Sequence, residues 1–313
     1  MSQVSMPTQA GEVARPVSPF SRRNTLGFRW LEKVLRFIRG KPLASLGGFF
    51  VLVMGLLAIF ADIAAPHDPL LMYDGKALLS PGGEFWLGSD PWGRDVLSRI
   101  IYGARVSMSV GLGAVCISGI GATLLGSISA YVGGRLDTYV QRVVDAVMAI
   151  PDIVLLLTIM AVLGPGALNI ILALAFRNTI TQSRIVRSAV LGIKEQQYIE
   201  AARALGATDI RVLGRHVFPN IVAPVIVILT VSMGWNILAE ASLSFLGYGV
   251  PLDIPTWGNM LSRESREYMM RGPWIAIFPG LALSLVVWGI NMFGDGLRDV
   301  LDPRLRGSSA QRR

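Results

Sequence analysis

The strongest constraint on the fold is the arrangement of the apolar residues, which come in long blocks separated by short charged stretches. A transmembrane helix needs about 20 consecutive apolar residues. The blocks are continuous rather than alternating, which predicts helices and not the strands of a barrel. We therefore expect an all-α, polytopic membrane protein with six transmembrane helices. They are expected at residues 43–65, 106–131, about 143–163, about 167–186, 221–246 and about 273–294.

The composition supports a membrane protein and excludes several other classes. Only 16% of the residues are charged, whereas a soluble domain carries about 25%. The net charge of +8 does not indicate a nucleic-acid partner, because the basic residues flank the apolar blocks instead of forming one patch. The chain has one cysteine, Cys116, and two histidines, His67 and His216. These are too few for a disulfide within the chain, and they offer little for a metal site or a His-based catalytic centre. We expect no metal site and no enzymatic activity in this chain.

The distribution of Lys and Arg predicts the orientation in the membrane. With the N-terminus in the cytoplasm, the inner connections hold 21 Lys and Arg residues and the outer connections hold 5. This asymmetry follows the positive-inside rule and, with an even number of spans, places both termini in the cytosol. The expected parts are a cytosolic N-terminal tail at 1–42 with an amphipathic helix at 28–39, a first transmembrane helix at 43–65, an external segment with a surface helix at 66–105, a core of five transmembrane helices at 106–294, and a cytosolic C-terminal tail at 295–313.

The stretch 93–103 predicts the external surface helix, lying on the outer leaflet of the membrane. Its apolar residues share one face, and its charged and hydroxyl residues share the opposite face, toward water. An interfacial anchor without further function and a part in gating both fit this pattern. The apolar face is Val96, Leu97, Ile100 and Ile101, and the polar face is Arg94, Asp95, Ser98 and Arg99.

The largest internal connection, residues 194–219, predicts two helices joined by a turn on the cytosolic face. Good helix formers precede Gly206, which fits a helix stop. Thr208 or Asp209 can cap a second short helix, which Pro219 would end. The simple alternative is a pair of helices that only connects the fourth span to the fifth.

This connection resembles the EAA loop of permease subunits in binding-protein-dependent ABC importers. In that family the loop is a coupling helix that docks on the ATP-binding subunit, and small residues such as Ala201 and Ala202 let it press into a groove. The general pattern has Ile and Leu where this chain has His216 and Phe218. His216 followed by Pro219 resembles the dipeptide and oligopeptide branch, and Phe218 is a departure. The residues expected to couple to the ATPase are Glu200, Ala201, Ala202, Leu205, Gly206, His216 and Pro219.

Three further stretches resemble the same branch, and specifically its second permease subunit. They are residues 86–99 before the second span, 242–258 at the end of the fifth span, and 294–304 near the end of the chain. Several motifs in order, over about residues 30–306, are more specific than any one motif. In the family such outer segments face the substrate-binding protein. The contact residues expected here are Pro255, Trp257 and Gly258.

The resemblance implies the type I ABC importer permease fold, in the cytoplasmic (inner) membrane of a prokaryote, and import of dipeptides or oligopeptides. It also implies a homologous permease that completes the pore, two ATP-binding subunits and an extracytoplasmic solute-binding protein, besides membrane lipid. The sequence contains no phosphate-binding loop. ATP and Mg²⁺ are therefore expected in the partner subunits, and no cofactor in this chain. Other members take glutathione, nickel complexes or opines, and the sequence does not choose among these substrates.

Polar residues inside the expected spans are the candidates for the pore. A charged side chain in a span is costly, so it normally faces the interior of the bundle or water. The alternative is structural, with Arg177 paired to an acidic residue to hold the bundle together. The candidates are Asp152, Arg177, Asn178, Asn236, Glu240 and Asn291.

Two other functions compete with an importer subunit. A stand-alone secondary transporter or channel would use Asp152, Glu240 and Arg177 for ion coupling, and it predicts inverted repeats that the sequence does not display. An intramembrane enzyme would need paired catalytic residues within the spans, and neither histidine lies in one. The sequence favours the importer subunit.

Overall fold

The computed structural model describes residue 35 and residues 37–301, with only the backbone described at 263–265. The chain divides into two compact units at Gly40, and the second, which begins at Lys41, holds the fold described below. The amphipathic helix expected at 28–39 falls mostly outside the described residues. The tail expected from residue 295 begins inside a helix that continues to Leu301.

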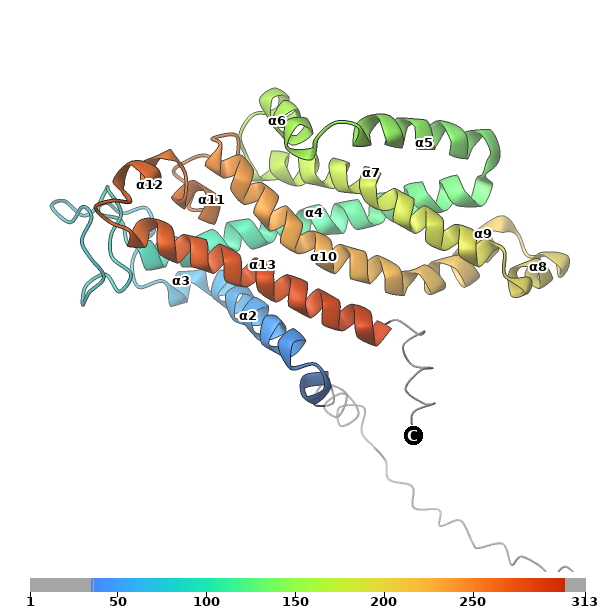
Figure 1. Ribbon diagram of the computed structural model, residues 1–313, viewed down its shortest axis with the longest axis horizontal. Coiled ribbons are helices and arrows are strands. Elements are labelled where there is room, and N and C mark those ends of the chain that lie inside the picture. The colour runs from blue at the N-terminus through green and yellow to red at the C-terminus, as the bar shows by residue number, and fades with distance from the viewer. Residues whose placement is uncertain (1–34, 36, 302–313) are drawn as a thin grey trace, which may run out of the picture. The chain divides into compact units, whose positions relative to one another are not determined.

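The second unit is helical, and its described residues form no β-strand beyond one isolated bridge between Ser89 and Asp95. Its long helices run lengthwise and pack side by side (Figure 1). In chain order the helices are α2 (Pro42–Ile59), α3 (Ala61–Ala64), α4 (Val96–Val132), α5 (Gly134–Met148), α6 (Asp152–Leu163), α7 (Ala167–Lys194), α8 (Gln197–Ala204), α9 (Asp209–Val212), the π-helix η1 (Leu213–Val217), α10 (Phe218–Phe245), α11 (Trp257–Met260), α12 (Arg263–Tyr268) and α13 (Trp274–Leu301).

Helix α4 is central, because it packs against α7, α10 and α2, while α13 packs against α2 and α10. Glycine residues let these helices approach closely. Between α4 and α7, a Cβ atom on Gly126 would lie 2.5 Å from the carbonyl oxygen of Ser183. Between α2 and α13, a Cβ on Gly47 would lie 2.6 Å from the carbonyl oxygen of Gly289. The backbones therefore meet at both contacts, and a larger side chain would push them apart.

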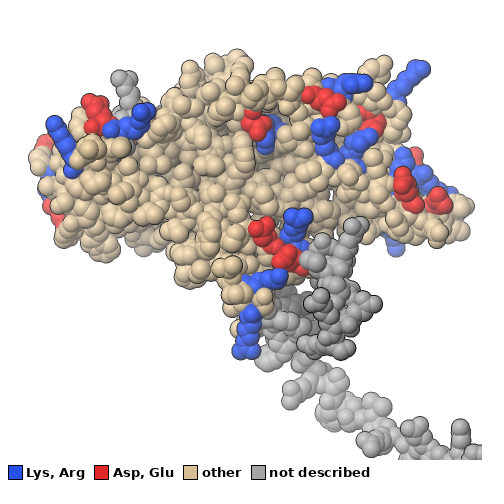
Figure 2. Space-filling view, in the orientation of Figure 1, with Lys and Arg blue, Asp and Glu red and all other residues tan. Residues whose placement is uncertain are grey.

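The surface of this unit suits a lipid environment. In Figure 2, charged side chains gather toward the ends of the long helices, and the area between them holds few. Large apolar side chains are exposed along these helices, for example Leu52 on α2, Ile120 on α4 and Leu172 on α7. Helices satisfy their own backbone groups, so an apolar helix surface is stable in hydrocarbon.

The third expected span, 143–163, is not one helix. Helix α5 ends at Met148, α6 begins at Asp152, and the two helices are bent by 91°. Pro151 lies at the break, where it lacks an N–H donor and disfavours a helical conformation in the residue before it. Helix α6 has 12 residues, or about 18 Å, which is short of the roughly 30 Å hydrocarbon core. The pair therefore counts as one broken span at most.

The fourth expected span corresponds to α7, which has 28 residues and is long enough to cross a membrane. Its polar residues, among them Arg177 and Arg184, lower its hydropathy. Among the described residues, four helices are long and apolar enough to cross a membrane, or five if the bent pair is one span. A count of six spans requires α7 as well.

The surface helix expected at 93–103 is instead the beginning of α4, which runs without a break for 37 residues. Its polar face does not lie in water, because Arg94, Asp95 and Arg99 are all buried. Segment 66–95 folds back over this end of α4 and supplies partners for these side chains. The expectation of a separate amphipathic surface helix was therefore wrong.

We expect Gly47→Ala to destabilise the protein by about 1–3 kcal/mol, the usual cost of overpacking, because its Cβ would meet the backbone of Gly289. Gly55→Ala is the matched control in the same helix, since its Cβ would lie 3.8 Å from the Met108 side chain. Alanine is favoured over glycine in helices by up to about 1 kcal/mol, so the control should be neutral or stabilising. Thermal unfolding in detergent measures both variants, and equal midpoints would contradict the close contact.

Candidate functional site

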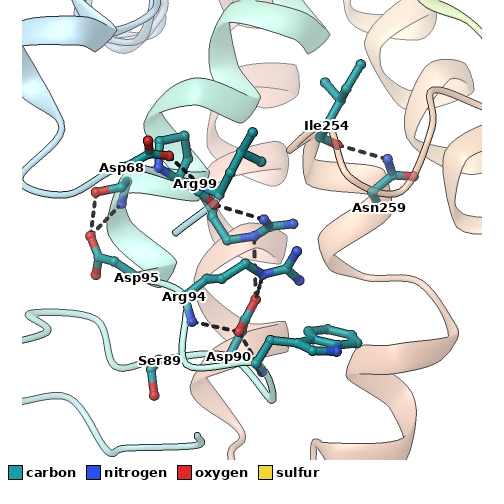
Figure 3. A network of polar contacts seen from close by, with 12 residues as sticks. Asp68, Ser89, Asp90, Arg94, Asp95, Arg99, Ile254 and Asn259 are labelled. Carbon is teal, nitrogen blue, oxygen red and sulfur yellow. Dashed lines mark hydrogen bonds and ion pairs between the residues drawn. The ribbon is translucent and has the colours of Figure 1, made fainter. Parts of the chain in front are cut away.

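A cap, formed by residues 66–95 and 248–262, lies at one end of the bundle around a buried ion-pair network (Figure 3). We name it the outer cap after the side of the membrane that the sequence predicts for these residues. Asp90 is at its centre. One carboxylate oxygen of Asp90 accepts a hydrogen bond from the backbone nitrogen of Arg94 at 2.9 Å. The other accepts one from Arg94 Nε at 2.6 Å, and Arg99 Nε lies 3.7 Å from it. Buried charges persist only with such partners, so the network fixes the cap to the start of α4.

The three residues expected to contact an external protein are buried within this cap. The indole N–H of Trp257 donates to a backbone carbonyl oxygen of α4 at 3.1 Å. A Cβ on Gly258 would lie 2.5 Å from a backbone carbonyl oxygen of α10, and Pro255 is buried beside them. A buried indole needs an acceptor inside the protein. The expectation of direct contact is therefore corrected, because these three residues are buried and support the cap from within. Tyr248 and Leu252 are among the exposed residues of the cap.

Four of the six pore candidates form one polar cluster between α6, α7 and α10. The guanidinium of Arg177 makes two hydrogen bonds to the carboxylate of Asp152, one of them 2.9 Å long from Nε. It also donates to Asn178 Oδ1 at 3.0 Å. Asn178 in turn donates to Asn236 Oδ1 at 2.6 Å, and Asn236 Nδ2 lies 3.4 Å from the carbonyl oxygen of Gly111 on α4. A bidentate Arg–carboxylate pair has a specific geometry as well as strength, so the cluster ties four helices together.

Glu240 and Asn291 lie apart from this polar cluster. Glu240 is fully buried, and its carboxylate accepts hydrogen bonds from the hydroxyls of Ser107 at 2.7 Å and Ser244 at 2.8 Å. It has no surface that a solute reaches in this structure, and it joins α4 to α10. Asn291 lies on α13 against Gly234. In the part of the chain that the structure describes, no group of three or more His, Cys, Asp or Glu side chains is placed to hold a metal ion.

A groove of about 930 Å³ lies where the polar cluster reaches the surface. Mostly apolar side chains of α6, α10, α13 and residues 261–269 line it, with Asp152 and Arg266 as the charged lining residues. The side chain of Asp152 is 42% exposed and that of Arg177 is 17% exposed. The guanidinium of Arg177 also lies 4.5 Å from the ring centroid of Trp235, a cation–π contact that holds it in place. The groove therefore combines an apolar wall with one partly exposed carboxylate.

The elbow, residues 195–217, lies at the end of the bundle opposite the cap (Figure 1). Ile199 and Val212 are fully buried in a cluster with residues at the ends of α4 and α7, so they anchor one face. The other face presents Leu205, which is 89% exposed, and Ile210, which is 84% exposed. Ile210 was not among the residues predicted from the sequence, although a large apolar residue in a mostly polar connection indicates a surface for contact with another protein.

Six of the seven sequence-predicted coupling residues lie on this elbow, and Pro219 lies just beyond it. Gly206 has a φ of +84°, a left-handed conformation that glycine adopts without penalty, and it forms the turn between α8 and α9. Pro219 does not end the second helix as expected, because α9, η1 and α10 follow one another without a gap. It lies in the first turn of α10, directly after the π-helix η1, so its missing N–H removes one bond to the preceding turn without ending the helix. Among the seven predicted coupling residues, Ala202 and His216 are half-buried. The exposed ones are Glu200, Ala201, Leu205, Gly206 and Pro219.

We expect Asp152→Asn to destabilise the protein by about 1–3 kcal/mol, between the values for exposed and buried pairs. Asp145→Asn is the matched control, because Asp145 pairs with Arg184 on the same helix α7 and should contribute less than about 1 kcal/mol. The difference arises because the Arg177 side chain is 17% exposed and that of Arg184 is 46% exposed. Thermal unfolding compares both variants, and adding Arg177→Gln to Asp152→Asn should recover part of the loss. Equal destabilisation by Asp152→Asn and Asp145→Asn would contradict the larger contribution expected of the more buried Arg177–Asp152 pair.

Comparison with known proteins places the chain in a family. The family described as binding-protein-dependent transport system inner membrane component matches residues 122–307. The family described as N-terminal TM domain of oligopeptide transport permease C matches residues 30–81. The dipeptide transport system permease protein of Alkalihalophilus pseudofirmus is 40% identical over 277 residues, which cover 88% of this chain and 90% of that protein. The glutathione transport system permease protein of Escherichia coli is 38% identical over 297 residues, 95% of this chain and 97% of that protein.

A solved structure shares the fold. The MetNI methionine ABC transporter, in an inward-facing conformation, contains a chain that is 20% identical, with a TM-score of 0.51. The match covers 66% of this chain and 97% of the other. The resemblance inferred from the motifs is confirmed, and the chain belongs to the family of binding-protein-dependent transport system inner membrane components.

Proposed function

We propose that this chain is the transmembrane permease subunit of an ATP-driven importer of dipeptides or oligopeptides, and that it forms half of the translocation pore. The observation that carries the proposal is the two-faced elbow at one end of the bundle. Ile199 anchors its inner face, while Leu205 and Ile210 stand exposed on the outer face. Two large apolar side chains on a short polar connection mark a surface for a protein partner.

The elbow is the contact with the ATP-binding subunits in this proposal. Leu205 and Ile210 flank the Gly206 turn, and the small side chains of Ala201 and Ala202 leave room for a groove wall to approach. ATP and Mg²⁺ belong to the two partner subunits, and this chain holds no cofactor of its own. Closure of the ATP-binding subunits would displace the elbow and change the access of the cavity from one side of the membrane to the other.

Six spans fit this role, with α5 and α6 together as one of them and α7 as another. The charge of α7 is the obstacle to its crossing a membrane, and ion pairs reduce the cost of that charge, because each of its three arginines pairs with an acidic residue of α5 or α6. Paired charges are the form in which a span tolerates ionised groups. With both termini in the cytosol, the elbow lies on the cytosolic side. The pairs are Arg177–Asp152, Arg184–Asp145 and Arg187–Asp137.

The groove beside the polar cluster is our candidate for this chain's half of the pore. Its apolar wall and the partly exposed carboxylate of Asp152 suit peptides with varied side chains. A homologous permease would close the groove into a cavity. A peptide substrate is supported by the relatives, whose names specify dipeptide and glutathione transport. An extracytoplasmic binding protein would deliver the peptide at the outer cap, in the cytoplasmic membrane of a prokaryote.

A secondary transporter is less well supported by the same geometry. Ion coupling would need acidic groups that are free to bind and release a cation. Asp152 is paired with Arg177, and Glu240 is buried and bonded to two hydroxyl groups. The described arrangement therefore favours a pore subunit driven by partner ATPases.

We expect two ATP-binding subunits to be recovered with the tagged chain from native membranes, and much less of them with Leu205→Ser or Ile210→Ser. Burial of one such side chain contributes about 1.5–3 kcal/mol, so each change should weaken the contact about tenfold or more. Met270→Ser is the matched control, because Met270 is 87% exposed but lies at the opposite end, next to the cap. If the chain is recovered alone and moves solute without ATP, the secondary transporter takes the place of the importer.

A further inference from the structure

Tyr131 lies in the last turn of α4 and links that helix to the elbow. Its side chain is buried, and its hydroxyl donates a hydrogen bond to Asp209 Oδ1 at 2.6 Å. Asp209 is the first residue of α9. A hydrogen bond to a carboxylate is shorter and stronger than one between neutral groups. The end of α4 is therefore bonded to the second half of the elbow.

Two cations add further contacts at the same tyrosine. Lys194, the last residue of α7, places Nζ 5.6 Å from the ring centroid and donates to the carbonyl oxygen of Tyr131 at 2.7 Å. Arg203 of α8 places its guanidinium 5.2 Å from the ring centroid. Cation–π contacts and a cation at a helix C-terminus both stabilise such an arrangement. One side chain thus contacts the end of α7, α8 and the start of α9.

Helix α4 is not a sequence neighbour of the elbow, so only packing and side-chain contacts connect the two. Helices α7 and α10 flank the elbow along the chain and follow its movement through the backbone. Helix α4 follows it only through non-covalent contacts. Its 37 residues span about 55 Å. At its far end, Arg99 joins the cap network and the carbonyl oxygen of Ile100 accepts the indole hydrogen bond of Trp257.

We propose that Tyr131 is a positioning residue that attaches the elbow to α4, so that displacement of the elbow is passed along α4 to the outer cap. The inference rests on the proposed function, in which the ATP-binding subunits displace the elbow. The hydrogen bond to Asp209 carries the attachment, and the ring contacts with Lys194 and Arg203 fix the direction of the hydroxyl. A contact that only stabilised the fold would not alter the uptake obtained per ATP hydrolysed.

The test uses the complete importer, purified with its partner subunits and binding protein and reconstituted in liposomes. Tyr131→Phe removes the hydroxyl and keeps the ring, and Asp209→Asn keeps an acceptor oxygen. Asp209 is exposed, so water can solvate it in the Tyr131→Phe variant and the chain should still fold. Tyr139→Phe, at an exposed tyrosine of α5, is the control. Uptake of a mixture of radiolabelled dipeptides, ATP hydrolysis and recovery of the ATP-binding subunits are measured for each variant.

We expect Tyr131→Phe to keep its ATP-binding subunits and to hydrolyse ATP within about twofold of the original rate. Its uptake per ATP should fall about tenfold, the scale of a lost hydrogen bond to a charged group. Asp209→Asn should retain at least about half of the uptake per ATP, and Tyr139→Phe all of it. Adding Asp209→Ala to Tyr131→Phe should cause no further loss, because both changes remove one interaction.

Three outcomes for the variants would overturn the inference and leave the proposed function in place. Unchanged uptake per ATP in Tyr131→Phe would show that the hydrogen bond carries no movement. Loss of the ATP-binding subunits from this variant would assign Tyr131 to assembly, and independent, additive effects of Tyr131→Phe and Asp209→Ala would separate the two residues. If the unaltered complex hydrolyses ATP without peptide uptake, the proposed function fails first, and the inference fails with it.

Discussion

The pairing of charges inside an apolar bundle is the constraint on which much of this structure depends. Helix α7 carries arginines along its length, and an unpaired guanidinium among apolar helices is costly. Each of its three arginines has an acidic partner on α5 or α6. The bend at Pro151 places Asp152 in the first turn of α6, where it faces Arg177. The break between α5 and α6 therefore brings Asp152 into the polar cluster.

Helix α4 connects the outer cap, the buried Glu240 and the elbow. Its glycines allow close contact with α7, as at Gly126, and its polar groups bond to other elements along its whole length. Arg99 lies in the outer cap, Ser107 is bonded to Glu240, and Tyr131 is bonded to the elbow. Because these contacts lie on one unbroken helix, movement at the elbow has a direct mechanical route to the cap.

The candidate sites differ in how far the sequence predicted them. The turn of the elbow at Gly206 was predicted, because it depends on local turn geometry, whereas the coupling role of the surrounding residues stays a prediction. The outer cap was predicted less well. Trp257 and Arg99 appeared as surface residues, since an amphipathic pattern reveals two faces of a helix but not what covers each face. Glu240 likewise read as a pore residue, although two hydroxyl groups satisfy it inside the bundle.

The sequence by itself determined that the chain is helical and suited to a membrane, because the length of an apolar run is a local property. It also determined the family, since motifs and their order are written in the sequence. Only the tertiary structure decided that the third expected span bends by 91° and which polar residues meet. Tyr131 and Asp209 are 78 positions apart, and such partners are chosen by how helices pack, which no local pattern contains.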